Sequence, residues 1–262
     1  MSTIRFERRE GIGRIVLANP PYNRIDLQYA TSLREAVHAA SESDIRVLLI
    51  RADGPHFSMG GEVREWPGKD INWFRTFVSD VNASYRAIEA LRVPTVAAVH
   101  GLVLGGGFEL ALACDFIVAA EDAVLRCVEV TTGMLPIAGG LQRLAERVGR
   151  SRASRFSMLG EPILGKQAGE LGIATHVVPA ATLDAEAEAL AQRLALGPTR
   201  SYAATRTMLK AWSGGGITTA DAVMPDVTME LFLTQDVQRG FIHTAKAFDA
   251  DIEPPEMTFN GK

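Results

Sequence analysis

Short apolar runs alternate with helical patterns through the first half of the chain. Four runs rich in apolar and β-branched residues predict buried strands: residues 14–18 (RIVLA), 46–51 (RVLLIR), 93–99 (VPTVAAV) and 115–119 (DFIVA). Residues 27–40 lie between the first two runs and carry apolar side chains at helical spacing. Another helical stretch opens near Gly106, between the last two. This alternation predicts βα crossovers, buried sheets and therefore an α/β fold.

The last third of the chain has a different pattern. Strand signals stop at about Ala181, and helical patterns then cover residues 183–196, 198–212 and 218 to about 248. A helix stop meets a helix start at Gly197-Pro198, so we expect a domain boundary there. Residues 1–196 then form a core domain and residues 197–262 a helical domain. The glycines at 214–216 predict a hinge or turn inside the helical domain, and the tail that follows it is expected to be irregular.

Composition and charge narrow the class of protein. The 262 residues include 47% hydrophobic residues and carry a net charge of −4, which argues against nucleic-acid binding. No apolar run approaches the ~20 residues of a membrane-spanning helix, and the first residues lack the apolar core of a secretion signal. Cys114 and Cys127 lie in apolar segments, which favours buried thiols in a reducing compartment. We therefore expect a cytoplasmic protein with neither nucleic acid nor membrane as a partner.

Two glycine-rich segments are the first candidates for chemistry, residues 57–62 (FSMGGE) and 104–109 (LGGGFE). Neither has the spacing of a dinucleotide-binding or P-loop motif, and the histidines fit no metal motif. The first amides of a helix lack intrahelical acceptors, and glycine lets a ligand approach the backbone closely. Amides from the two segments can therefore converge on one oxygen that gains negative charge. The alternative is that both are ordinary strand-to-helix turns.

Two further segments complete a recognisable pattern with these glycines. The four segments are residues 54–65 (GPHFSMGGEVRE), 100–111 (HGLVLGGGFELA), 129–144 (EVTTGMLPIAGGLQRL) and 168–178 (AGELGIATHVV). Together they resemble the crotonase (enoyl-CoA hydratase/isomerase) superfamily, over most of residues 10–210. The resemblance implies a crotonase-type spiral of stacked ββα units followed by a C-terminal helical domain. It also implies that this domain assembles trimers, which often pair into hexamers.

The resemblance assigns four residues to catalysis. Gly61 and Gly106 correspond to the donors of two oxyanion-hole amides, and Glu109 and Glu129 to the two acid/base carboxylates of the hydratases. Adding water to a double bond requires one group that activates the water and another that exchanges the α-proton. Glu109 lies about one helical turn beyond Gly106, so both can face one cavity. Two carboxylates in one apolar cavity repel, so one of them should take up a proton more readily.

The thioester substrate also needs a binding site. Arg64 matches a basic position of the family's first loop, and Arg24 is the next candidate for the phosphates of coenzyme A. The predicted substrate and coenzyme A site comprises Gly61, Glu62, Val63, Arg64, Gly106 and Arg24. Trp66, Trp73 and Phe74 fall in the segment that the resemblance places over the acyl chain. This aromatic segment suits a short or cyclic acyl group and is equally compatible with helix packing.

Several positions depart from the family pattern. Ile137 replaces a glycine whose amide helps to hold the attacking water in many hydratases. Its side chain is expected to enter the acyl pocket and to disfavour a positive φ. Glu62 replaces an aspartate, and Met59 replaces a small residue. Residues 241–248 do not cleanly reproduce the aromatic and lysine pair that contacts coenzyme A from a neighbouring subunit in the family, so that contact is left unassigned.

These features predict an enoyl-CoA hydratase that adds water through an enolate held in an oxyanion hole. Its partners are the acyl-CoA substrate and other copies of the chain. We expect no metal and no cofactor beyond the coenzyme A carried by the substrate. The alternatives are double-bond isomerisation or thioester hydrolysis on the same scaffold, or a non-catalytic acyl-CoA-binding homologue.

Overall fold

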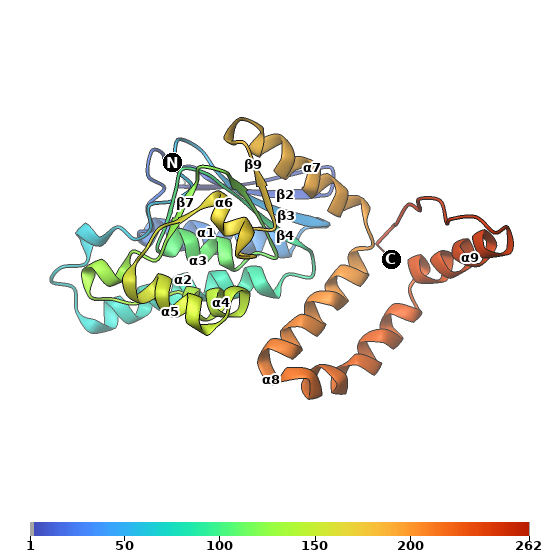
Figure 1. The fold of residues 1–262 in the computed structure, drawn as a ribbon. Coiled ribbons are helices and arrows are strands. Elements are labelled where there is room, and N and C mark those ends of the chain that lie inside the picture. Colours follow the sequence, from blue (N-terminus) through green and yellow to red (C-terminus); the bar gives the residue numbers. More distant parts are fainter. Residues whose placement is uncertain (1–2, 262) are drawn as a thin grey trace.

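The computed structural model describes residues 3–261 and contains two β-sheets covered by helices (Figure 1). The strands are β1 (Ile4–Arg9), β2 (Ile12–Leu17), β3 (Val47–Ala52), β4 (Thr95–Val99), β5 (Leu102–Leu104), β6 (Phe116–Ala120), β7 (Val124–Arg126), β8 (Ile163–Leu164) and β9 (His176–Val178). The α-helices are α1 (Leu27–Ser41), α2 (Ile71–Ala90), α3 (Gly106–Leu112), α4 (Gly140–Val148), α5 (Arg150–Leu159), α6 (Gly165–Glu170), α7 (Leu183–Leu196), α8 (Thr199–Phe232) and α9 (Gln235–Asp249). Short 3-10 helices are η1 (Val63–Glu65), η2 (Glu129–Thr132) and η3 (Ala180–Thr182).

Consecutive strands alternate between the two sheets in the middle of the chain. The larger sheet has the order β1-β2-β3-β4-β6-β9, and every pair except the antiparallel β1-β2 is parallel. The smaller sheet has the order β5-β7-β8. Thus β4 and β6 lie in the larger sheet while β5 and β7, which follow them, lie in the smaller one. Each pair of strands leads into helical structure, which is the stacked ββα arrangement expected from the sequence.

The predicted strands and first helix are present, with ends shifted by a residue or two. The middle strands β3 and β4 are buried along most of their length, and α7 packs against them on one side of the larger sheet. Helix α1 begins after Asp26, whose carboxylate accepts a hydrogen bond from the Tyr29 amide at 2.7 Å. Helix α2 buries Phe77, Val81 and Tyr85 at four-residue spacing, and this face borders the site described below.

The C-terminal helices extend away from the sheets, at the right of Figure 1. The predicted break at the glycines lies at Gly216, where φ is 72° and the two halves of α8 meet at a kink. The prediction of one helix from 218 to about 248 is wrong. The chain leaves the helix at Leu233, and the Thr234 hydroxyl caps α9 by accepting from the Val237 amide at 3.3 Å.

Arg206 joins α8 to the core. Its guanidinium pairs with Asp115 and donates to the carbonyl of Glu89 at 2.9 Å. Most of α8 beyond Arg206 is exposed to solvent. Among the described residues of α8, Ala220 is the only buried one. Large apolar side chains lie exposed along α8 and α9: Leu209, Trp212, Ile217, Met224, Met229, Phe232, Phe241, Ile242 and Phe248. No helix among residues 3–261 combines the length and the apolar character needed to cross a bilayer.

Candidate active site

The turn between β5 and α3 is built from glycines. Gly105 has a φ of 49°, which places it in the region that favours glycine, and its amide donates to the Arg126 carbonyl at 3.0 Å. A Cβ on Gly107 would lie 2.5 Å from the Cβ of Ser58, so the helix approaches the neighbouring loop as closely as glycine allows. Helix α3 begins at Gly106 with Glu109 in its first turn, as the sequence predicts.

The second glycine segment lies directly against this turn. The Leu104 amide donates to the Ser58 carbonyl at 2.9 Å, and Gly60, with a φ of 77°, packs against the Leu104 carbonyl. On either side of Gly61 the chain pairs with Ile25. The Ile25 amide donates to the Gly60 carbonyl, and the Glu62 amide donates to the Ile25 carbonyl. Within residues 3–261, the amides of Gly61 and Gly106 have no hydrogen-bond partner. The fold therefore brings both predicted oxyanion donors to one region with their N–H groups unused.

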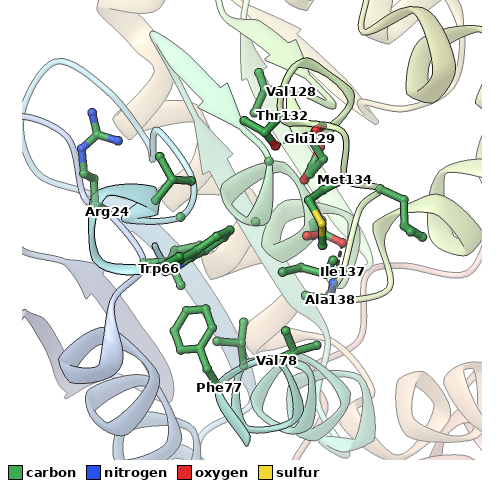
Figure 2. A pocket seen from close by; sticks show the side chains of 18 of the residues that line it. Arg24, Trp66, Phe77, Val78, Val128, Glu129, Thr132, Met134, Ile137 and Ala138 are labelled. Atoms are coloured by element: carbon green, nitrogen blue, oxygen red, sulfur yellow. Dashed lines mark hydrogen bonds between the residues drawn. The ribbon is translucent and has the colours of Figure 1, made fainter. Parts of the chain in front are cut away.

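These amides border a cavity of about 220 Å³ (Figure 2). Its apolar lining consists of Ile25, Met59, Val63, Trp66, Phe77, Val78, Val81, Val128, Met134, Leu135 and Ile137. The charged residues on its wall are Arg24, Glu109 and Glu129. Ligand pockets typically enclose roughly 300–1,000 Å³. A cavity of this size has room for a small apolar group and not for a ligand much larger than that.

Glu109 is held at the cavity by one of its two oxygens. The side chain is 2% exposed, and Oε1 accepts hydrogen bonds from the amides of Ala138 at 2.8 Å and Gly140 at 2.7 Å. Oε2 is buried and has no partner within residues 3–261. Burial raises the pKa of Glu109, whereas the Gly140 and Ala138 amides oppose that rise by stabilising the carboxylate. One oxygen is thus fixed by the backbone, and the other is available to a ligand.

Glu129 begins η2, directly beyond β7, on the other side of the glycine turn. Its Oε1 lies 3.2 Å from the position of a Cβ on Gly105, while Oε2 of Glu109 lies 4.0 Å from that of a Cβ on Gly106. The two carboxylates therefore approach neighbouring residues of one turn. Burial, and to a smaller extent the charge of Glu109, raise the pKa of Glu129 to about 7. Its Oε2 is buried without a partner among the described residues.

The raised pKa of Glu129 predicts a pH-dependent cost to stability. A carboxyl whose pKa rises from 4.5 to about 7 on folding is favoured in its protonated form. The stability that the protonated Glu129 carboxyl contributes to the folded state is complete below pH ~4.5 and is lost as the pH rises through about 7. We therefore expect Glu129→Gln to have a higher Tm than the unmodified protein at pH 8 and a nearly equal one at pH 4.5, measured by calorimetry.

The exposed Glu170→Gln serves as the control, because its carboxyl lies outside the cavity wall and its Tm should follow that of the unmodified protein. A Glu129→Gln variant less stable than the unmodified protein at pH 8 would contradict the predicted burial cost.

The two arginines predicted to bind coenzyme A share one carboxylate. Glu62 lies 3.6 Å from Arg24 Nε and forms a two-pronged pair with Arg64, which holds the pKa of Glu62 below its usual range. Arg24 and Val63 line the cavity, whereas Glu62 and Arg64 do not, and the Arg64 side chain is 77% exposed. Glu62 thus joins Arg24, on the cavity wall, to Arg64 outside it.

Trp66 and Ile137 both lie on the cavity wall, as the resemblance implies (Figure 2). The Trp66 ring packs against Gly61, where a Cβ would lie 2.6 Å from Cζ2, and against the rings of Phe74 and Phe77. Ile137 does not adopt a positive φ; the turn takes its left-handed residue at Gly139, with a φ of 89°. The expected strain at Ile137 is therefore absent.

Other lining residues were not among the sequence candidates. Phe77, Val78 and Val81 come from α2, and Met134 and Leu135 from the loop after η2. The four-residue spacing of Phe77, Val81 and Tyr85 identifies the buried face of α2 but not the cavity beside it. The amides of Ala138 and Gly140 give no signal in the sequence, because any residue but proline carries one. Among residues 3–261, no three His, Cys, Asp or Glu side chains gather as a metal site.

Comparison with known proteins defines the class. The chain belongs to the enoyl-CoA hydratase/isomerase family, whose pattern it matches over residues 7–248. It is 35% identical over 183 residues to 2,3-dehydroadipyl-CoA hydratase of Escherichia coli, covering 68% of this chain and 70% of that protein. It is 36% identical over 180 residues to mitochondrial methylglutaconyl-CoA hydratase of Homo sapiens, covering 67% of this chain and 53% of that protein.

Solved structures agree over almost the whole chain. An enoyl-CoA hydratase of Bacillus anthracis superposes with a TM-score of 0.88 and 26% identity, covering 99% of this chain and 100% of that one. An enoyl-CoA hydratase of Polaromonas superposes with a TM-score of 0.87 and 25% identity, covering 98% and 99%. The predicted crotonase fold, with its two sheets and C-terminal helices, is confirmed.

Proposed function

We propose that this protein hydrates the α,β double bond of enoyl-CoA thioesters. The observation that carries the proposal is the pair of carboxylates at the Gly105–Gly106 turn, each with one buried oxygen that has no partner among the described residues. They lie beside two amides that have no acceptor. An oxygen that accepts from both amides is suited to gain negative charge, which is the charge that builds on a thioester carbonyl as an enolate forms.

The two carboxylates have different environments and so suit different tasks. Backbone amides donate to Glu109 and favour its ionised form, which accepts a proton from water as that water attacks the β-carbon. Glu129 has no such donors from the 137–140 turn, and its pKa of about 7 keeps much of it protonated near neutral pH. It delivers its proton to the α-carbon of the enolate. In the reverse direction each group carries out the opposite transfer.

The cavity lining supports an apolar, uncharged acyl group as the substrate. Its one basic residue among those described is Arg24, which pairs with Glu62, and two carboxylates already line the wall. A spectrophotometric screen of short, long and aromatic enoyl-CoA thioesters, and of one ending in a carboxylate, tests the proposal. We expect hydration of at least one uncharged thioester and a lower kcat/KM for the charged one. No hydration of any of them would refute it.

Trp66 is expected to limit the length of that acyl group, because its ring fills the space between Gly61 and the aromatic side chains of α2. Trp66→Ala should raise the ratio of kcat/KM for a long against a short enoyl-CoA by about tenfold, the effect of one or two methylenes in an apolar pocket. Trp73→Ala is the matched control, since Trp73 also stacks on Phe77 but does not line the cavity. An equal change of the kcat/KM ratio in both variants would mean that the packing of α2, and not the Trp66 ring, limits the length of the acyl group.

We further propose that residues 197–262 form an oligomerisation domain. The exposed apolar side chains of α8 and α9 find few partners within their own chain, and burying them against other copies removes them from water. Sedimentation at micromolar concentration should give a trimer or a dimer of trimers, and Trp212→Asp should shift it toward smaller species. A stable monomer of the unmodified chain would contradict this.

A further inference from the structure

The turn that holds Glu109 is packed between two charged side chains. On one side, a Cβ on Gly140 would overlap Cγ of Glu109. On the other side, a Cβ on Gly139 would overlap the guanidinium of Arg143. Gly139 also has a φ of 89°, so a side chain there is excluded by conformation as well as by space. The two glycines thus let a carboxylate and a guanidinium approach opposite ends of one turn.

Hydrogen bonds connect these two side chains through a single residue. Ala138 donates its amide to Glu109 Oε1 at 2.8 Å and accepts, at its carbonyl, a hydrogen bond from Arg143 Nη1 at 2.8 Å. Rotation of the Ala138 peptide groups would therefore break both contacts. The position of the Glu109 carboxylate depends on a turn whose other end is fixed by Arg143.

Arg143 is in turn held by α2. Its Nε and Nη2 donate to the two oxygens of Glu89 at 2.5 and 2.6 Å, a two-pronged geometry that a lysine cannot form. The Arg143 side chain is 11% exposed and does not line the cavity. Glu89 lies near the end of the helix that supplies Phe77 and Val81 to the acyl wall. The pair thus connects the acyl wall to the turn that holds Glu109.

We propose that Arg143 is a positioning residue for Glu109: it fixes the 138–140 turn so that the carboxylate presents its free oxygen to the cavity in ionised form. The role in catalysis rests on the proposed hydration. The placement and ionisation of Glu109 do not depend on it, and they can be measured without substrate. Charge and geometry contribute separately. Burial raises the pKa of Glu109, and the positive charge of Arg143 opposes that rise, while the planar guanidinium holds the turn.

The first test titrates Glu109 in the substrate-free protein by NMR of carbon-13-labelled glutamate side chains, with its signal assigned by its loss in Glu109→Gln. Removing the charge in Arg143→Gln should raise the midpoint, while Arg143→Lys should leave it nearer that of the unmodified protein. Arg155→Gln is the matched control, because Arg155 also pairs with a glutamate, Glu161, but is exposed and outside the cavity wall. Equal midpoints in Arg143→Gln and Arg155→Gln would overturn the proposal, whatever the activity of the protein.

The second test measures hydration of an enoyl-CoA found active in the screen. Both Arg143→Gln and Arg143→Lys should lower kcat by about 10²-fold, the usual scale for a misplaced catalytic group, with KM changed far less. The acid side of the pH profile of kcat/KM should move to higher pH in Arg143→Gln only. A fall in kcat with an unmoved profile and an unmoved Glu109 midpoint would assign Arg143 a merely structural role and overturn the proposal.

Discussion

Removing the Gly106 amide while preserving the helix is expected to lower kcat by about 10²- to 10³-fold, the cost of one oxyanion donor. Proline at position 106 lacks the N–H group, and it is well tolerated at the first position of a helix such as α3. Gly105 carries no Cβ, so the proline ring does not meet the usual clash with a preceding side chain. The change therefore acts on the donor more than on the fold.

The ring atoms of a proline at position 106 need space, and the experiment needs a matched control. A Cβ on residue 106 would lie 2.6 Å from Cδ1 of Ile25, and Ile25→Val removes that atom. The pair to compare is Gly106→Pro and Gly106→Ala, each combined with Ile25→Val. The alanine variant keeps the amide and should stay within about tenfold of the unmodified enzyme, because it loses no oxyanion donor. Equal kcat for the two double variants would show that the Gly106 amide does not stabilise the transition state.

Replacing each of the two glutamates by glutamine should impair hydration and α-proton exchange to different extents. Glu129→Gln should lose both hydration and α-proton exchange, by about 10²-fold or more, because a neutral amide cannot accept the α-proton. Glu109→Gln should lose hydration to a similar extent but retain part of the exchange, since the amides of Gly61 and Gly106 still stabilise an enolate. Each variant is incubated with a saturated acyl-CoA in deuterated water, and isotope uptake is followed by mass spectrometry.

The exposed Glu170→Gln is again the control and should match the unmodified enzyme in both assays. If Glu129→Gln exchanges as fast as the unmodified protein, the assignment of the α-proton to Glu129 is wrong. If Glu109→Gln loses exchange as completely as Glu129→Gln, the two carboxylates act on one proton and not on two.

The fold and the positions of the glycine turns follow from local patterns in the sequence. Strands β3 and β4 are short apolar runs, and α3 begins where glycine frees the backbone after a strand. Glu109 is buried because Phe108, Leu110 and Ala111 around it are buried as well. These features depend on neighbours within a few residues, which is why the sequence alone predicts them.

Other parts of the site depend on contacts between distant segments. Arg143 and Glu89 are 54 residues apart, and nothing in their local sequence links them. The pairing of Arg24 with Glu62 arises only when the loop before α1 lies beside η1. The apolar spacing continues across Thr234 and predicts no helix break there, whereas the Thr234 hydroxyl caps a new helix. Tertiary packing decides the pairings of Arg143 and Arg24, whereas the Thr234 cap is a local feature of the sequence.

The proposed hydration is tested most directly by turning over an uncharged enoyl-CoA in oxygen-18 water and locating the heavy oxygen by mass spectrometry. We predict one heavy oxygen within the acyl group of an intact 3-hydroxyacyl-CoA, and formation of this labelled product about 10²-fold more slowly with Glu109→Gln. Heavy oxygen in a released carboxylic acid would indicate thioester hydrolysis, a shifted double bond without heavy oxygen would indicate isomerisation, and unchanged substrate would indicate no turnover. Any of these three results in place of the 3-hydroxyacyl product would contradict the proposed function.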